Sequence, residues 1–542
     1  MNPHISKFLR RLCAVIVVLF LSVSEVALAA PSPSVVAQSA TTSKEKTNDK
    51  QPSAAVVSAE NESLRGEFEK HYLLSDGSFM AVTYAEAVHY KDGNGKWQEV
   101  DNTLTQKNGK GNRIENAYEA FKVSFANTGS TGDMVSLSGK GSSLSWSLHA
   151  SKKNGTRSAK KSDNSYKVTL PKSEPSKKSN QIVGKKATDK DSFASEKMSG
   201  KLRFESVESD SPELSVDYTV YHNKIEEDIY INAPTEAETI DFTFHTNGLR
   251  AVVKKDQSVE FLTDKGIVKY RIGIPYMEDA KGNVLNKIEV SVSQDDTACI
   301  ISYRPDPDWF HSSDRAYPLL LDPSITTGEY QSNITDTYVV QGNTENHSSE
   351  QKLYIGVRSG KIYRTYLKVN NLPNIDSNMP IVSATLQLKN TIGSSTGKMV
   401  QLYRCSNSWN PSTITYANQP SISSGNYTAF CGFQDTYSFD LTYNITNLYA
   451  GSFANNGYVL KYSDESSNKP DYNAVYSSEY TTVAYRPVLT IVYGYALPTV
   501  LTNGGVYSFQ NVGISSSSEY LRSTPMYVSD FSMISWTIGP AV

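Results

Sequence analysis

Apolar and polar residues alternate in short runs along most of the chain, and this alternation predicts β-strands. Residues 120–125 alternate with a period of two, which places the apolar side chains on one face of a strand. Residues 381–388 do the same and should bury one set of side chains, namely Val382, Ala384, Leu386 and Leu388. Turn signals such as Asn94-Gly95 separate the runs, and helical spacing is almost confined to residues 443–449. The pattern predicts an all-β protein.

Changes in composition divide this strand-rich chain. Residues 30–62 are largely Ser, Ala, Thr, Lys and Pro, so we expect a disordered linker there. Residues 63–323 are expected to form an antiparallel β domain, with the lysine-rich tract 151–200 inserted as a long loop. That tract is either a solvated loop or a surface that attracts an anionic envelope polymer. Residues 325–494 contain the strands of one complete β module, which we expect to fold alone.

The N-terminus indicates export. Basic residues up to Arg11 precede an apolar run at residues 13–21, and Ala27-Leu28-Ala29 offers a cleavage site, as in a secretory signal peptide. The apolar run has about half of the ~20 residues that cross a bilayer, which disfavours an uncleaved anchor. We therefore predict a signal peptide at residues 1–29, no transmembrane segment after cleavage, and a secreted, extracellular protein.

Cysteines and charge narrow the chemistry further. Cys13 leaves with the signal peptide, and Cys299 lies in an apolar run that suggests a buried position. Cys405 and Cys431 share one module and are a candidate disulfide in an oxidising compartment. The net charge of −3 gives no electrostatic case for nucleic acid as a partner. The sequence has no spacing typical of metal ligands and suggests no cofactor.

Catalytic patterns are missing from the sequence. It has no nucleophile elbow, phosphate-binding loop or dinucleotide-binding glycine pattern. A glycosidase needs two carboxylates about 5–10 Å apart, whereas the acids at Asp464, Glu465 and Asp471 lie on a turn-like stretch. Asp440 precedes the short helical run and is better placed to cap a helix than to act as an acid. We therefore predict that the protein is not an enzyme, with hydrolase activity as the alternative.

Four segments of the first domain occur in one order: residues 97–104, 225–229, 275–282 and 316–323. They resemble the N-terminal region of large secreted bacterial proteins of the wall-associated, YD-repeat and Rhs types. The resemblance implies a bacterial surface or cell-wall architecture and no particular activity.

The second module resembles the DNRLRE-type domain, which is related to carbohydrate-binding module family 96. The segments that carry this resemblance are residues 336–339, 353–356, 363–369, 381–388, 408–416, 440–442 and Arg486-Pro487. The resemblance implies a jelly-roll β-sandwich and a polysaccharide or cell-envelope polymer as partner. The family usually has Trp where Tyr416 stands, and the turn near Asn346 also departs from its pattern, so ligand contacts there stay open.

Several side chains of this module are candidates for carbohydrate contact: Trp409, Tyr416, Tyr462, Tyr472, Tyr476 and Arg364. The indole of Trp409 either stacks on a sugar ring or packs beneath its loop, and packing is the favoured alternative. Arg364 lies within a strand, where a guanidinium group either pairs with a protein carboxylate or carbonyl or recognises a sugar or uronate. Tyr462, Tyr472 and Tyr476 flank the polar loop at residues 463–473 and are expected at the surface.

Residues 500–542 resemble the first strands of a ricin-type β-trefoil lectin. Together these observations predict a secreted, non-catalytic bacterial surface protein that binds carbohydrate through its central β-sandwich. The alternative is a structural or delivery scaffold, namely the N-terminal shell of a wall-associated or Rhs-type toxin.

Overall fold

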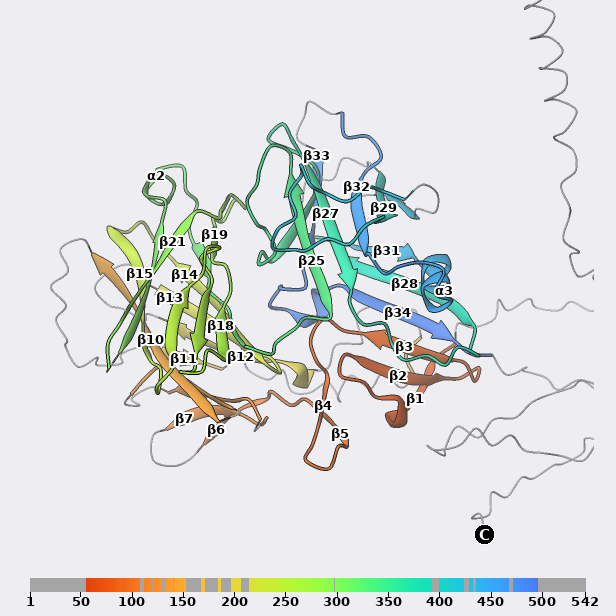
Figure 1. The fold of residues 1–542 in the computed structure, drawn as a ribbon, viewed down its shortest axis with the longest axis horizontal. Helices are drawn as coiled ribbons and strands as arrows, with labels where there is room; N and C mark the ends of the chain where they lie inside the picture. The colour runs from red at the N-terminus through yellow and green to blue at the C-terminus, as the bar shows by residue number, and fades with distance from the viewer. Residues whose placement is uncertain are drawn as a thin grey trace, which may run out of the picture. The chain divides into compact units, whose positions relative to one another are not determined.

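The computed structural model describes residues 55–495 with gaps (Figure 1). The gaps are residues 108–111, 119, 128–131, 140, 153–166, 171–183, 187–195, 206–213, 297, 392–398, 424–427, 432–434 and 467–470. The predicted signal peptide and the lectin-like segment lie outside the described residues, as do most of the linker and most of the lysine-rich insert. Among the described residues, no helix has the length and apolar character needed to span a membrane.

The prediction of an all-β protein is confirmed, because the described chain consists of antiparallel sheets with short helices. One sheet of the N-terminal part has eight strands. In sheet order they are β21 (Ile288–Gln294), β22 (Cys299–Pro305), β15 (Ala237–His245), β10 (Ser142–Lys152), β9 (Val135–Gly139), β8 (Lys122–Ala126), β7 (Arg113–Asn116) and β6 (Leu104–Lys107).

A second, eleven-stranded sheet packs against the first. Its main path is β11 (Lys167–Thr169), β12 (Gly200–Glu205), β13 (Leu214–Val220), β14 (Lys224–Ile231), β24 (Ile325–Thr327), β18 (Val268–Ile272), β17 (Val259–Leu262) and β16 (Arg250–Val253), with β19 (Tyr276–Glu278), β20 (Val284–Leu285) and β23 (Leu319–Asp322) beside it. Phe125 of the first sheet lies 5.2 Å from Tyr218 of the second, between ring centroids. One apolar core therefore holds the two sheets together.

The C-terminal part is a β-sandwich built on a second core. Its seven-stranded sheet contains β30 (Thr428–Cys431), β29 (Met399–Arg404), β32 (Tyr458–Tyr462), β27 (Lys361–Val369), β26 (Lys352–Arg358) and β33 (Asp471–Tyr476), with β25 (Ile334–Val340) also paired to β27. The six-stranded sheet runs β1 (Val57–Glu60), β2 (Glu69–Leu74), β3 (Phe79–Thr83), β34 (Val488–Tyr493), β28 (Ile381–Lys389) and β31 (Thr436–Asp440).

Short elements complete the chain. They are the strand pair β4 (His89–Lys91) and β5 (Trp97–Glu99), the helices α2 (Pro307–Phe310) and α3 (Thr442–Tyr449), and the 3-10 turns η1 (Glu62–Leu64), η2 (Glu196–Met198) and η3 (Val483–Tyr485). Helix α3 lies where helical spacing predicted it.

Strand β28 differs from its predicted face at one position. Ala384, Leu386 and Leu388 are buried as expected, whereas Val382 is 55% exposed. The register with β34 shifts between Ile381 and Ser383, and such a bulge turns one side chain away from the alternating pattern. The apolar pattern alone carried no sign of this bulge.

Three strands of the six-stranded sheet come from the N-terminal end of the chain. Strand β3 pairs with β34 from Phe79 opposite Tyr493 to Thr83 opposite Leu489, and red β3 lies beside blue β34 in Figure 1. The Phe79 and Tyr493 rings stack at 5.5 Å. The sandwich therefore extends beyond the module expected at residues 325–494.

The linker expected at residues 30–62 also extends too far. Residues 57–60 form strand β1, which pairs with β2. Val57 is buried beside Tyr72 and Leu74, and this apolar contact holds a segment whose neighbours are mostly small and polar.

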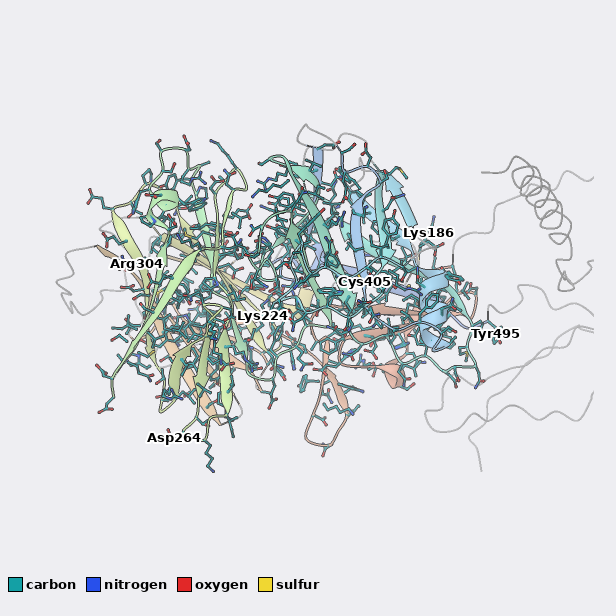
Figure 2. All side chains as sticks on the ribbon, turned by 45° about the horizontal axis from the view of Figure 1, so that its top comes forward. Lys186, Lys224, Asp264, Arg304, Cys405 and Tyr495 are labelled. Carbon is teal, nitrogen blue, oxygen red and sulfur yellow. The ribbon has the colours of Figure 1, made fainter. Side chains whose placement is uncertain are left out.

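A buried network of charges links the N-terminal strands to the sandwich. Arg486 precedes β34, and its Nη1 lies 2.9 Å from Glu86 Oε1 while its Nη2 lies 3.6 Å from Glu226 Oε1. Lys224 of β14 pairs with Glu226 at 2.6 Å and also with Glu479. Figure 2 shows Lys224 between the N-terminal sheets and the sandwich. Residues far apart in the sequence therefore share one ionic cluster.

The neighbours of Arg486 and Lys224 keep both cations charged. Burial alone would lower the pKa of Arg486, but Tyr221, Glu86 and Glu226 together raise it above its ordinary value. The pKa of Lys224 rises in the same way, because Glu226 and Glu479 outweigh its burial. Losing one member of such a cluster leaves a charge without its partner in a region that excludes water.

We expect residues 325–494 on their own to be much less stable than residues 55–495. The shorter fragment lacks strand β3, so β34 loses a paired strand and the sandwich core loses the buried Phe79 and Ala81 side chains, at a cost on the order of 3 kcal/mol. Urea denaturation followed by circular dichroism compares the two fragments. A cooperative transition at the same urea concentration in both would contradict this prediction.

Asp336 should make stability depend on pH. It lies buried in β25, where the Ser478 N–H donates to its Oδ2 at 2.7 Å. Burial outweighs this hydrogen bond and raises the pKa of Asp336 to about 8, against about 4 in an unfolded chain. Between these two pKa values the folded state keeps a proton that the unfolded state has released. The contribution of Asp336 to the free energy of unfolding is therefore complete below about pH 4 and is lost as the pH rises through about 8.

The Asp336→Asn variant should therefore lose less unfolding free energy than the wild type between about pH 5 and pH 8. The difference in loss should be on the order of 4 kcal/mol, because the interval covers about three pH units and each corresponds to about 1.4 kcal/mol. Urea denaturation at several pH values measures both proteins. Parallel curves of stability against pH would show that Asp336 does not bind the proton.

Candidate functional site

The outer face of the seven-stranded sheet gathers aromatic and charged side chains. Strand β29 alternates, with Val400 and Leu402 in the sandwich core and Gln401 and Tyr403 turned away from it. Strand β32 does the same, with Leu460 in the core and Lys461 on the outer side with Gln401. We call this outer surface the β29–β32–β27 face.

Cross-strand pairing aligns these side chains in rows. Gln401 lies opposite Lys461, and Thr365 lies opposite Leu460, so Lys461 lies opposite Arg364 on the next strand. The Lys461 ammonium lies 5.9 Å from the Tyr403 ring centroid, and the Tyr403 hydroxyl donates to Gln401 at 2.6 Å. A half-buried aromatic ring therefore lies next to a cation and an amide, which is a combination that can contact a sugar ring and its hydroxyl groups.

Arg364 is held by the protein. Its Nε and Nη2 donate to the two carboxylate oxygens of Glu465 at 3.0 and 2.6 Å, and its Nη1 donates to Gln419 at 2.9 Å. Burial opposes the charge of Arg364, but the bond to Glu465 raises its pKa above the ordinary value. Glu465 also lies 3.5 Å from the Lys461 ammonium. Arg364 therefore positions Glu465 and, through it, Lys461.

Trp409 packs beneath its loop, as the favoured alternative proposed. Its Nε1 donates to the Asn456 carbonyl at 2.9 Å, and its ring meets Tyr366 edge-on at 5.6 Å. Tyr416 of the same loop lies under the Arg364 guanidinium at 5.1 Å. The structure thus brings Trp409, Tyr416 and Arg364 together at one end of the β29–β32–β27 face.

The other three tyrosine candidates lie elsewhere. The expectation that Tyr462 is at the surface is wrong, because it alternates with Lys461 and points into the sandwich core, fully buried. Tyr472 lies 5.3 Å from the Arg358 guanidinium. Tyr476 belongs to a separate aromatic group. Its ring centroid lies 4.0 Å from that of Tyr480 and 5.2 Å from that of Tyr485.

Four contributors to the face were not predicted: Gln401, Tyr403, Lys461 and Gln419. Alternation in residues 399–404 could have placed Gln401 and Tyr403 on one face. The sequence holds no sign that this strand lies two places from Arg364, because strand order depends on long-range pairing.

The predicted bridge between Cys405 and Cys431 is wrong, because Cys405 is a free, buried thiol. Strand β30 places Cys431 opposite Met399, and Cys405 lies six positions further along the chain. At about 3.3 Å per residue the two Cα atoms are much further apart than the ~7 Å limit of a disulfide. Cys299 is buried as expected.

The acidic candidates have local structural contacts. Asp440 Oδ1 accepts from the Thr442 backbone N–H at 2.9 Å and from its hydroxyl at 2.6 Å. Asp440 thus holds the turn before α3, but it does not cap the helix as expected, because the N-cap residue is Leu441 and no side chain caps the helix. Asp464 Oδ1 accepts from the Ser466 backbone N–H at 2.9 Å. Within the described part of the chain, no three His, Cys, Asp or Glu side chains are arranged to hold a metal ion.

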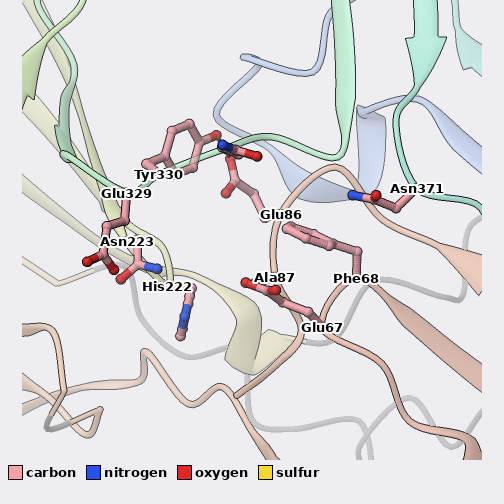
Figure 3. Close-up of a pocket in the computed structure, with 10 residues that line it drawn as sticks. Glu67, Phe68, Glu86, Ala87, His222, Asn223, Glu329, Tyr330 and Asn371 are labelled. Carbon is pink, nitrogen blue, oxygen red and sulfur yellow. Dashed lines mark hydrogen bonds between the residues drawn. The ribbon is translucent and has the colours of Figure 1, made fainter. Parts of the chain in front are cut away.

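A polar cavity of about 300 Å³ lies between the segments that precede β2 and follow β3, the turn before β14 and the segment before β25. Figure 3 shows the residues that line it; among them are Glu67, Glu86, His222, Glu329 and Tyr330. The Tyr330 hydroxyl donates to Glu86 at 2.7 Å, and Glu86 also holds Arg486. The cavity therefore borders the ionic cluster.

Comparison with known proteins supports a carbohydrate-binding module in the sandwich. Residues 328–493 match the model of Carbohydrate-binding module family 96. This stretch contains every residue of the β29–β32–β27 face.

The chain is also similar to curated bacterial proteins. It is 24% identical over 351 residues to the tRNA(Glu)-specific nuclease WapA of Bacillus subtilis subsp. natto, and equally to the tRNA nuclease WapA of Bacillus subtilis strain 168. The match covers 60% of this chain and 13% of either relative. The chain thus spans a small part of the length of these relatives.

Two solved structures show distant likeness. The Heparinase III-BT4657 gene product shares 10% identity at a TM-score of 0.24, over 51% of this chain and 41% of its own. The N-terminal domain of the Streptococcus gordonii adhesin Sgo0707 shares 7% identity at a TM-score of 0.12, over 81% of this chain and 97% of its own. At these scores neither likeness defines a common fold.

Proposed function

We propose that this chain is a secreted, non-catalytic surface protein that binds a bacterial cell-envelope or extracellular polysaccharide through its sandwich. The observation that carries the proposal is the match of residues 328–493 to a carbohydrate-binding family. The N-terminal signal pattern supports export of the chain.

The β29–β32–β27 face is the surface that we assign to the polysaccharide. The Tyr403 ring offers an apolar surface for the C–H groups of a pyranose, and Lys461 and Gln401 beside it offer hydrogen bonds to hydroxyl or carboxylate oxygens. Glu465 lies between Arg364 and Lys461 and limits the motion of both. A face that is ordered before binding loses less entropy on binding a flexible glycan.

We expect affinity electrophoresis to show retention of the protein by at least one polymer from a panel of neutral, uronic-acid and peptidoglycan-derived polysaccharides. Replacing Tyr403 or Lys461 by alanine should weaken this retention about fivefold to tenfold, since an aromatic or charged contact contributes on the order of 1 kcal/mol. Thermal unfolding of each variant checks that the fold is intact.

Matched controls lie away from the face. Tyr443→Ala removes an exposed tyrosine from α3, and Lys287→Ala removes a largely exposed lysine from the N-terminal part. Both should migrate like the wild type. Free migration of the wild type in every polymer would refute carbohydrate binding, and equal retention of all variants would place the ligand on another surface.

We also expect no turnover of glycan, ester or peptide substrates by the purified protein. Catalysis of glycan cleavage requires two facing carboxylates, whereas Asp440 and Asp464 bind backbone N–H groups. An activity that co-purifies with the protein and is lost in Asp440→Asn or Asp471→Asn, with circular dichroism unchanged, would show that an active site had been missed.

A structural or delivery scaffold is the second candidate function. The observation that favours it is the match of 60% of this chain to 13% of the length of proteins named WapA nucleases. In this alternative the sheets form the N-terminal shell of a larger toxin. Coding sequence that continues into YD repeats would favour the scaffold, whereas completed trefoil repeats would favour glycan binding.

A further inference from the structure

A second cavity, of about 310 Å³, lies outside the β29–β32–β27 face. It opens over strands β12, β13 and β14 of the N-terminal part and is bordered by Thr481 of the sandwich. Residues that line it include Lys201, Arg203, Asp217, Thr219, Asp228 and Tyr230. Its volume is at the lower end of the range of small-ligand sites, about 300–1,000 Å³. We call it the Lys201 cavity.

The two cations of the Lys201 cavity differ in their partners. Arg203 Nη1 donates to both carboxylate oxygens of Asp217 at 3.0 Å, and its Nη2 donates to Ser215 at 2.9 Å. The Lys201 Nζ donates to the Thr482 hydroxyl at 3.3 Å. Among the residues that the structure describes, it has no carboxylate at ion-pair distance. The charge of Lys201 is thus left for a ligand.

Electrostatics agree with this geometry. Burial lowers the pKa of Lys201, and Asp228 and Asp217 offset that effect only in part. Burial also raises the pKa of Asp228 well above its usual range, and the Gln351 amide donates to Asp228 at 2.6 Å. Asp228 is therefore a weak counter-charge for Lys201. An anionic group of a ligand in the cavity would supply a stronger counter-charge for the Lys201 ammonium.

The remaining walls suit a sugar ring. Tyr230 is half-buried, and the Arg203 guanidinium lies 5.4 Å from its ring centroid, so the ring is held in place and offers an apolar wall. Thr219 and Thr481 line the same space. The Tyr221 hydroxyl donates to the Thr481 carbonyl at 2.8 Å and so holds the sandwich side of the cavity.

We propose that the Lys201 cavity binds a uronic acid unit of an acidic polysaccharide, with the sugar carboxylate on Lys201 and the ring against Tyr230. The proposal rests on the proposed glycan-binding function but uses a different surface. Because both the N-terminal strands and the sandwich line this site, neither part would form it alone.

Isothermal titration of the purified protein with trigalacturonate tests the proposal. Lys201→Met should weaken the binding about tenfold or more, because a hydrogen bond between two charged groups is lost. Tyr230→Leu keeps the ammonium and should weaken the binding about fivefold. The fully methyl-esterified trisaccharide, which has no carboxylate charge, should bind the wild type about tenfold more weakly.

Lys287→Met is the matched control, because it removes a largely exposed lysine of the N-terminal part that does not line the cavity. It should leave the affinity for trigalacturonate within about twofold of the wild type. Lys201→Arg keeps the positive charge but not the compact ammonium, and should weaken the binding less than Lys201→Met does. Equal affinity of Lys201→Met and the wild type, with both folded by thermal unfolding, would overturn the proposal. A wild type that is retained by neutral polysaccharides but does not bind trigalacturonate would overturn it and leave the proposed function standing, whereas failure to bind any glycan would overturn both.

Discussion

The burial of Arg486 is the constraint on which the rest of the structure depends. A guanidinium group cannot lose its proton under ordinary conditions, so its removal from water must be balanced by nearby negative charge. Glu86 follows the N-terminal strands of the sandwich, and Glu226 lies in the eleven-stranded sheet. One side chain near the C-terminal end of the described chain therefore depends on two distant segments.

This constraint couples parts of the protein that composition separates. Strand β3 completes the sheet that β34 begins, and Glu479 of the sandwich pairs with Lys224 of β14. The β29–β32–β27 face belongs to the sandwich alone, whereas the Lys201 cavity needs both parts. With both proposed sites occupied, one polysaccharide chain, or two, would be held at separate points of the protein. Linked contacts of this kind raise the retention of a polymer without raising the affinity of either site alone.

Individual candidates show where reasoning from residue type succeeds. Packing was the favoured alternative for Trp409, and its indole donates to a loop carbonyl. An arginine within a strand suggested a carboxylate partner, and Arg364 has one in Glu465. In contrast, Tyr462 was placed at the surface because of the loop beside it, although its position in the alternation with Lys461 decides its burial.

The sequence by itself determined the all-β class, the short helix α3 and a β module within residues 325–494, because alternation, helical spacing and family motifs are local patterns. Only the tertiary structure decided that β1 to β3 join the sandwich and that Cys405 and Cys431 stay apart. It also decided that Lys201 has a threonine hydroxyl, and no carboxylate of the described residues, beside its ammonium. These outcomes depend on which strands become neighbours. That choice is made by the burial of side chains hundreds of residues apart, and no short stretch of sequence contains it.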